Sequence, residues 1–341
     1  MGARAQQDYG FFGPDSVTWK VWGYPTSIVL GFLRAVVIEE LDPYLVASVD
    51  QSGQVKQRPK LRYDRTMQYF ATVKFGDAES VLRASDTLMK IHTRAVGHDP
   101  VTGGRYDAND PSSQLWIHLT AWHSILYTYE IFGPGKLTEA EEAQYWNECA
   151  RAAEFQTIDP ADVPRTREGI RAYFAAYRPR LAGSEVAQDM MDFLLDASTT
   201  VLPERMPTPI RVVFNAVARR AVIATLPRWM RKLGATTQSG LTDRVAVALT
   251  RPVVRAAAAS TWVQLWALRL ASPRTAPILE PVLRRTPPMH PVVREPAEAR
   301  AEYGVTDPRV QYAAILAERE RQSGPAPYPK HHAEELLPFP A

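Results

Sequence analysis

The chain has 341 residues, of which 45% are hydrophobic and 23% charged, and its net charge is +3. This composition is typical of a folded globular protein and excludes collagen-like, disulfide-scaffold and wholly disordered classes. The near balance of 40 basic and 37 acidic residues, without a dense basic stripe, argues against a nucleic-acid partner. Cys149 is the only cysteine, so an intrachain disulfide and Cys-rich metal sites are ruled out and a reducing compartment is expected.

The beginning of the chain shows no targeting signal. Its first twenty residues carry charged side chains and no apolar run of the secretory type, so we expect a cytoplasmic protein. The apolar run Ile28 to Ile38 is broken by Arg34 and is too short to span a bilayer, so no transmembrane span is expected. Pro209 to Leu233 mixes apolar residues with six Arg and Lys residues. An ordinary amphipathic helix is the favoured interpretation of this segment, and a peripheral membrane contact is left open.

Residues 1–272 form the predicted folded body, because several long segments show the 3.6-residue hydrophobic period of amphipathic helices. No series of alternating strands joined by hairpin turns is visible. The predicted fold class is therefore all-α. In chain order the expected helices are Ser27 to Leu41, Arg62 to Phe75, Ala78 to Val96, Pro111 to Phe132, Glu139 to Phe155, Pro164 to Leu181, Glu185 to Leu195, Pro209 to Leu233 and Leu241 to Leu270.

Capping residues and prolines refine three of these helices. Asp110 before Pro111 is a favourable helix start, and Thr138 followed by Glu141 has the spacing of a capping box. Pro252 is expected to kink the last helix, because proline lacks an amide donor and its ring crowds the preceding turn.

Residues 273–341 are predicted to be a Pro-rich C-terminal extension, since 13 of the 28 prolines lie there. Within it, Pro273 to Pro296 is expected to be mostly extended and Asp307 to Arg321 to form one helix. Ser323 to Ala341 has the composition of a tail.

Standard catalytic motifs are missing from the sequence. It contains no dinucleotide, P-loop, nucleophile-elbow, zincin or EF-hand signature, and no Glu-x-x-His pair of the di-iron type. His92 and His118 are the histidines of interest, because each is predicted on an apolar helix face. A core histidine bonded to a carbonyl is the commoner arrangement for such residues, and metal ligation is the alternative. Arg62 and Thr66 stand four apart and share one helix face. Helix capping, or an ordinary solvent-exposed polar face, would by itself account for two polar residues at this spacing.

Six short segments between residues 11 and 235 stand in a fixed order. They are residues 12–19 (FGPDSVTW), 62–66 (RYDRT), 75–77 (FGD), 91–97 (IHTRAVG), 105–111 (RYDANDP) and 116–118 (WIH). In order and spacing they resemble the motifs of the DUF2236 family, which comprises the MpaB-type oxygenases and the latex clearing proteins, or rubber oxygenases. The family's pattern between His and Gly is one residue longer, and Ser112-Ser113-Gln114 is more polar than the family usually shows.

The resemblance implies a partly globin-like helical fold that holds a non-covalent haem b. It implies that His92 is the axial ligand of the haem iron, with His118 as the alternative ligand or a residue near the haem. Arg62 and Thr66 would lie near the haem and be needed for function. Arg65 is included among the haem-binding residues, yet it stands where the rubber-cleaving member has a lysine that ligates the iron. Arginine stays protonated and is a poor ligand, so that form of gating is not expected here.

The leading hypothesis is a haem b-dependent oxygenase that acts with dioxygen on an apolar, isoprenoid or lipid-like small molecule. Rubber itself is not expected, because no secretion signal is visible. One alternative is a haem-binding sensor or carrier without catalysis, which Arg65 would suit. Another is a metal-free helical interaction protein whose Pro-rich end docks partners. The sequence leaves the substrate, the product and the oligomeric state open.

Overall fold

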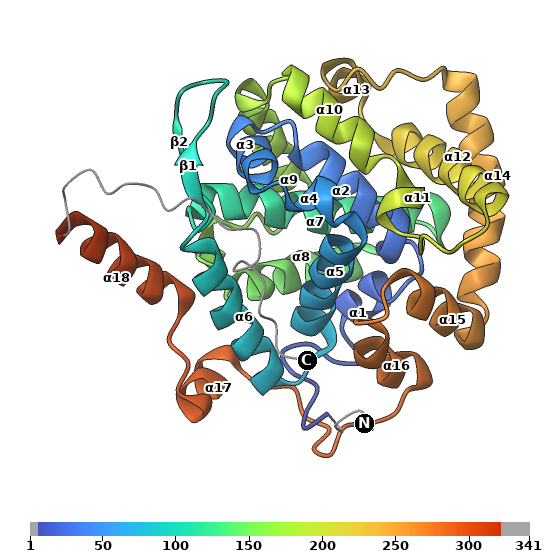
Figure 1. The fold of residues 1–341 in the computed structure, drawn as a ribbon. Helices are drawn as coiled ribbons and strands as arrows, with labels where there is room; N and C mark the ends of the chain where they lie inside the picture. Colours follow the sequence, from blue (N-terminus) through green and yellow to red (C-terminus); the bar gives the residue numbers. More distant parts are fainter. Residues whose placement is uncertain (1–5, 322–341) are drawn as a thin grey trace.

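The computed structural model describes residues 6–321, and these residues are mainly α-helical (Figure 1). Their one sheet has two short strands. The predicted all-α fold class is confirmed. The predicted tail, Ser323 to Ala341, lies outside the described residues.

The first part of the chain supplies the helices that surround the middle of the molecule. They are α1 (Val17–Trp22), α2 (Phe32–Glu39), α3 (Pro43–Ser52), α4 (Gln54–Gln57), α5 (Pro59–Phe75), α6 (Ala78–His92), α7 (Pro111–Phe132) and α8 (Glu139–Ala153). A π-helical turn, Ser27–Gly31, leads into α2. The predicted helix over Ser27 to Leu41 is therefore divided between this turn and α2, whereas Pro111 to Phe132 is confirmed at both ends.

The second part of the chain continues as helices to the end of the described residues. They are α9 (Arg167–Tyr177), α10 (Glu185–Leu194), α11 (Ala197–Thr200), α12 (Thr208–Thr225), α13 (Arg228–Leu233), α14 (Gly240–Ala258), α15 (Thr261–Ala271), α16 (Ala276–Arg284), α17 (Pro296–Tyr303) and α18 (Pro308–Arg321). The predicted start of α9 at Pro164 was wrong by three residues. Thr166 caps that helix by accepting a hydrogen bond from the Gly169 amide.

The predicted helix over Ala78 to Val96 was too long. The helix ends at His92, and the chain turns into an antiparallel hairpin made of β1 (Val96–His98) and β2 (Arg105–Asp107). Gly103, with a φ of +74°, provides the left-handed turn conformation that this connection needs. The hairpin therefore fixes the backbone directly after His92.

Two long predicted helices are each broken into a pair. Pro209 to Leu233 divides at Pro227 into α12 and α13. Leu241 to Leu270 divides at Ser260, whose side chain accepts a hydrogen bond from the Val263 amide and starts α15. Helix α14 continues through Pro252, where a kink was predicted.

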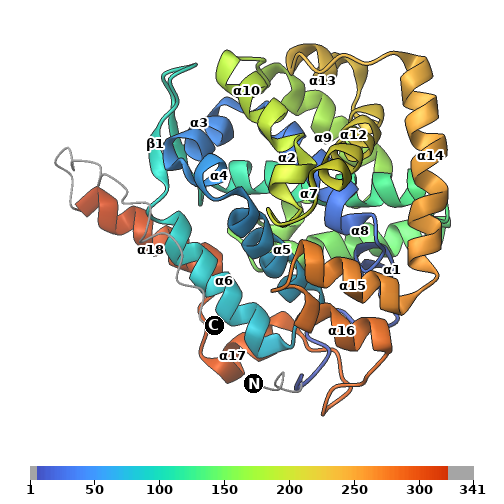
Figure 2. The same cartoon turned by 45° about the vertical axis from the view of Figure 1, so that its right-hand side comes forward.

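The expectation of extended chain over Pro273 to Pro296 was wrong in its first half, where α16 forms. Pro277 lies in the first turn of α16, where a missing amide hydrogen costs little. The helix packs against α5, and its Leu279 side chain is buried in the core. The expected helix over Asp307 to Arg321 is confirmed as α18, which projects from the body (Figures 1 and 2).

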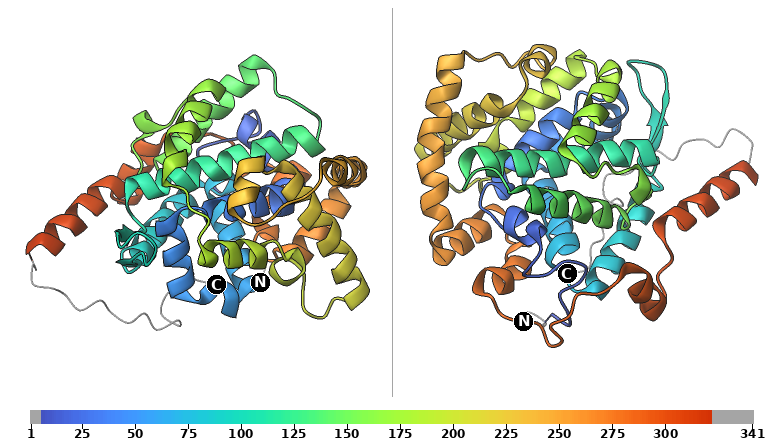
Figure 3. Two further views of the ribbon diagram at one scale, coloured as in Figure 1. Left: turned by 90° about the horizontal axis from the view of Figure 1, so that it is seen from above. Right: turned by 180° about the vertical axis from the view of Figure 1, so that it is seen from behind.

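Helix α7 crosses the middle of the molecule and organises the core (Figures 1 and 3). It contacts α1, α2, α8 and α14, and its Trp116, Leu119 and Trp122 are almost fully buried. Most of its surface is apolar or aromatic, so it can be covered from several sides. This arrangement holds α5 and α6 beside one end of α7, and these three helices frame the site described next.

Candidate functional site

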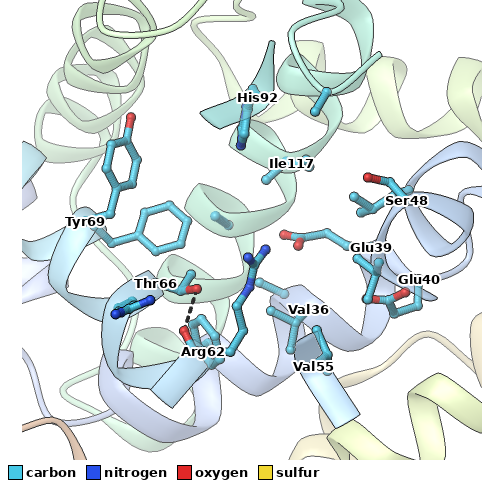
Figure 4. Close-up of a pocket in the computed structure, with 18 of the residues that line it drawn as sticks. Val36, Glu39, Glu40, Ser48, Val55, Arg62, Thr66, Tyr69, His92 and Ile117 are labelled. Atoms are coloured by element: carbon cyan, nitrogen blue, oxygen red, sulfur yellow. Dashed lines mark hydrogen bonds between the residues drawn. The ribbon is translucent and has the colours of Figure 1, made fainter. Parts of the chain in front are cut away.

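A cavity of about 300 Å3 lies between α2, α3, α5, α6 and α7. Apolar side chains form much of its wall, among them Val36, Phe70, Leu88, Ile91 and Ile117. Polar side chains also face it, and Figure 4 shows several of them grouped near its centre: Glu39, Arg62, Thr66 and His92. An apolar pocket with a few convergent polar groups is the usual form of a site for a small molecule or a cofactor.

Arg62 and Thr66 reach this cavity from successive turns of α5. The Thr66 hydroxyl donates a hydrogen bond to the Arg62 carbonyl at 2.8 Å, which holds the side chain against its own helix (Figure 4). The Arg62 guanidinium extends into the cavity. Its removal from bulk water lowers the pKa of Arg62, and the nearby Glu40 carboxylate partly offsets that effect.

His92 is the last residue of α6, and its imidazole lines the same cavity (Figure 4). Burial lowers the pKa of His92 to about 4, and the positive charge of Arg62 acts in the same direction. The imidazole is therefore neutral at physiological pH. A neutral imidazole is the form that binds a metal.

The surroundings of His92 Nδ1 indicate which ring nitrogen carries the proton. The Gln114 amide nitrogen lies 3.4 Å from Nδ1, but it already donates to the Ala108 carbonyl at 3.0 Å and to Asn109 Oδ1 at 3.2 Å. Both of its hydrogens are thus engaged, and the Ala108 carbonyl also forms a hydrogen bond with the imidazole. We therefore assign the proton to Nδ1, which leaves the lone pair on Nε2 for a ligand.

Two adjacent carboxyl groups at the end of α2, Glu39 and Glu40, also line the cavity. Sequence reasoning missed both of them. Burial raises the pKa of Glu40 to about 8 although Arg62 opposes the shift, and it raises the pKa of Glu39 well above its usual range. Glu40 Oε2 has no hydrogen-bond partner among the described residues. Glu40 therefore favours its protonated form at neutral pH, and Figure 4 shows Glu39 pointing toward Arg62.

Arg65 lies on the cavity wall one turn from Arg62. Its pKa is lowered by burial first and then by the like charges of Arg274 and Arg58, while Asp64 acts in the opposite direction. Arg65 Nε is buried, and no described residue accepts a hydrogen bond from it. This side of the cavity therefore carries positive charge that the protein only partly neutralises.

His118 is not among the residues that line the cavity. Its Nε2 atom lies 2.8 Å from the Cys149 carbonyl oxygen and 3.4 Å from Cys149 Sγ, on the side of α7 that faces α8. Burial lowers the pKa of His118 to about 3, and the positive charge of Lys74 adds to this shift. The structure thus gathers Arg62, Arg65, Thr66 and His92 around one space and leaves His118 outside it.

Lys74 was not singled out in the sequence, yet it is buried beside the aromatic end of the cavity. Its Nζ atom lies 4.4, 5.0 and 5.4 Å from the ring centroids of Trp22, Phe70 and Trp122. Burial lowers the pKa of Lys74 to about 7, and these three rings stabilise the charged form by cation–π contacts. Trp22 and Phe70 line the cavity, so Lys74 packs against two of its lining residues.

Comparison with known proteins identifies the family. Residues 19–259 match the family model described as "ER-bound oxygenase mpaB/B'/Rubber oxygenase, catalytic domain". No curated protein and no solved structure matches the chain. The matched range contains every residue that lines the cavity, and it supports an oxygenase role with dioxygen and a small-molecule substrate. The chain therefore belongs to the family of the ER-bound oxygenases mpaB/B' and the rubber oxygenases, whose catalytic domain it contains.

Proposed function

We propose that the protein is a haem b-dependent oxygenase that acts with dioxygen on an apolar, isoprenoid or lipid-like molecule. The observation that carries this proposal is the meeting of a neutral His92 with Arg62 and Thr66 in one largely apolar cavity. These side chains come from two different helices, α5 and α6, and they are brought together by the fold. The family supports the oxygenase part of the proposal independently.

The donor set of the cavity fits a haem. A porphyrin supplies four nitrogen ligands, so the protein has to add only one axial ligand, and an unprotonated imidazole nitrogen is well suited to that position. The assigned tautomer of His92 offers Nε2 for this purpose, and its Nδ1 lies beside the Gln114 amide, which itself binds the Ala108 carbonyl. A hydrogen bond from Nδ1 to that carbonyl would orient the ring and increase its basicity, as in other metal-binding histidines.

The charge of the cavity wall also fits a haem, which carries two propionates. Arg65 has a buried Nε atom without a partner in the described residues, and Arg58 and Arg274 add like charge nearby. A carboxylate placed there would offset this repulsion and accept the unused hydrogen bond. We therefore assign Arg65 to the binding of a propionate and not to the iron.

Bound haem would supply the iron that activates dioxygen. The chain's own groups would control the polarity and the protons around it. The Arg62 guanidinium extends into the cavity and can donate hydrogen bonds to a group bound there. Glu40, whose pKa is raised to about 8, favours its protonated form at neutral pH and can release a proton to a group bound in the cavity.

The rest of the wall supports an apolar substrate. Leu88, Ile91 and Ile117 lie around His92, and Val36 and Phe70 extend the apolar lining toward α2 and α5. Burying an apolar molecule against such side chains gains roughly 25 cal/mol for each Å2 removed from water. A polar substrate would lose its hydrogen bonds to water without regaining them from these apolar walls, so it would bind less favourably.

The test is the visible absorption spectrum of the protein purified from haem-supplemented cells, beside His92→Ala and His118→Ala. We expect a Soret band in the wild type and in His118→Ala, and none in His92→Ala. The coloured protein should consume dioxygen when an apolar isoprenoid substrate is supplied. A band lost only in His118→Ala would move the ligand to α7. A coloured protein that consumes no dioxygen would favour a haem sensor or carrier, and a colourless wild type after haem reconstitution would favour a metal-free interaction protein.

A further inference from the structure

Exposed apolar side chains gather in one stretch of the chain. Of the sixteen exposed large hydrophobic residues in the described part, ten lie between residues 210 and 266. Six of them recur at a spacing of four along α14 and α15: Leu241, Val245, Leu249, Val253, Trp262 and Trp266. Residues four apart lie on one side of a helix, so each of the two helices presents an apolar stripe to solvent. We call these six residues the α14–α15 surface.

This surface lies at the outside of the molecule. Helix α14 runs along one edge of the molecule, and α15 follows directly at one of its ends (Figures 1 and 2, and the right view of Figure 3). The opposite side of α14 carries the buried Ala246 and Thr250 and packs on α7 and α12. With 19 residues, α14 is about 28 Å long, so its stripe is a linear feature and not an isolated exposed side chain.

Basic residues are concentrated in and beside the α14–α15 surface. Between residues 205 and 279 the sequence has twelve Arg and Lys residues and one acidic residue, although the whole chain has a net charge of only +3, and three of the twelve, Arg219, Arg269 and Arg274, pair with acidic residues outside this stretch. That acidic residue, Asp243, is paired with Arg231 at 2.8 Å. Arg244, Arg251 and Arg255 are exposed on α14, at helical positions that border its apolar stripe. The surface is therefore apolar along its centre and cationic at its margin.

The tryptophans and the bordering arginines of this surface indicate what kind of partner it binds. Trp side chains prefer the interface between water and lipid, and arginines beside an apolar stripe attract anionic headgroups. A second copy of the chain would bring two strongly cationic margins together, which is unfavourable. We propose that the α14–α15 surface docks the protein onto bilayers that contain anionic lipids, with Trp262 and Trp266 inserted at the headgroup level. This inference does not depend on the proposed chemistry of the cavity.

The expected docking is peripheral. Among the described residues, no helix combines the length and the apolar character that crossing a bilayer requires. Attachment would thus come from shallow burial of the six side chains together with the attraction between arginines and anionic lipids, and it should weaken as salt is added.

The first measurement is flotation of the full chain with vesicles of phosphatidylcholine alone or mixed with phosphatidylserine. We expect the protein to float with the mixed vesicles at low salt, and to be recovered less at high salt and with the neutral vesicles. Absence of flotation with either type of vesicle, from a protein that is folded and monomeric, would overturn the proposal.

Leu249→Glu tests the apolar stripe, and Val310→Glu on α18 is its matched control. The two side chains are 62% and 60% exposed, so neither change should disturb the fold, which the melting temperature will verify. We expect Leu249→Glu to lower vesicle binding roughly tenfold or more, because it removes apolar area and places a negative charge against anionic lipid. Val310→Glu should bind as the wild type does. Equal effects of the two variants would contradict docking through α14.

Vesicles with brominated acyl chains locate the two tryptophans. Trp262 and Trp266 are 72% and 55% exposed, so their fluorescence should shift to shorter wavelength and be quenched on binding. The double variant Trp262→Phe with Trp266→Phe keeps apolar rings and should still float, but most of the quenching should disappear. Unchanged quenching in that variant would show that another face meets the lipid. A dimer in solution that Leu249→Glu dissociates, without vesicle binding, would assign the surface to a second copy.

Discussion

Arg62 and His92 face one cavity from two different helices, and the charge of Arg62 is the largest influence after burial that lowers the pKa of His92 to about 4. Protonation of His92 would place a second positive charge beside Arg62. Burial first, and the guanidinium second, therefore keep the imidazole unprotonated well below neutral pH. Whatever occupies the cavity near His92 meets the Arg62 cation beside a neutral nitrogen base.

Replacing Arg62 with Leu should raise the pKa of His92 from about 4 toward the ordinary histidine value, because the like charge is removed while burial remains. The measurement is an NMR titration of the imidazole carbon-bound proton in the haem-free protein. Arg83→Leu is a suitable control, since Arg83 lies exposed on α6 in an ion pair with Glu79. An unchanged pKa in Arg62→Leu would show that burial alone accounts for the shift.

Gln114→Leu should weaken haem binding by about ten- to a hundredfold, the usual effect of losing a group that orients a metal-binding histidine. The change removes the amide that bridges the Ala108 carbonyl and Asn109 beside His92. Haem titration of the purified protein, followed at the Soret band, measures this effect. Gln188→Leu removes an amide that likewise binds two carbonyls, but on α10, and should leave the haem affinity unchanged. Equal losses in both variants would point to general destabilisation.

Glu40→Gln should change how stability depends on pH. In the folded protein the pKa of Glu40 is raised to about 8 from an ordinary 4.5, so the folded state holds a proton that the unfolded state has released. Stability contributed by this proton is present below pH 4.5 and is lost as the pH rises through 8. Glutamine cannot ionise, so the variant does not lose this stability as the pH rises. Its free energy of unfolding relative to that of the wild type should therefore rise by a few kcal/mol between pH 5 and pH 8.

Urea denaturation at several pH values measures this prediction. Glu204→Gln, at an exposed position between α11 and α12, serves as the control and should follow the wild-type curve. A parallel pH dependence in wild type and Glu40→Gln would mean that Glu40 is already ionised in the folded protein at neutral pH.

His118→Ala should cost about 3 kcal/mol of unfolding free energy at pH 7, because it creates a cavity beside α8 and leaves the Cys149 carbonyl without its ring partner. Thermal or urea unfolding gives this value, with the exposed His290→Ala as the control. The pKa of His118 is lowered to about 3, so wild-type stability should fall as the pH drops from about 6.5 toward 3. The variant should fall less steeply over that range.

The helix ends that could be predicted are those with local chemistry. Asp110 accepts a hydrogen bond from Ser113 N, and Pro111 takes the first helical position, so α7 begins where the sequence indicates. The break at Ser260 was missed, because the alanine-rich stretch before it continues a helical pattern without interruption. Periodicity records which residues suit a helix, and it does not show that a Ser side chain will cap a new one.

From spacing alone, the site could be predicted only where its residues share one helix, and it was the family resemblance that added His92 to Arg62 and Thr66. Arg62 and Thr66 are four apart on α5, so their proximity follows from helical spacing. Glu39 and Glu40 lie far from them in the sequence and reach the cavity because α2 packs near α5, a contact that no local pattern reveals. His92 and His118 both stand on apolar faces. Their different surroundings depend on tertiary partners, Gln114 for the first and Cys149 for the second.

The contact between α16 and α5 limits where the chain can be truncated without exposing the site. The family match ends at residue 259, but Leu279 of α16 covers the helix that carries Arg62 and Thr66. Farther along, Arg319 of α18 pairs with Asp107 and donates to the Thr93 carbonyl, next to His92. An expression fragment cut at the family boundary would therefore uncover α5 and release the backbone after His92. The smallest unit that keeps these contacts extends to the end of α18.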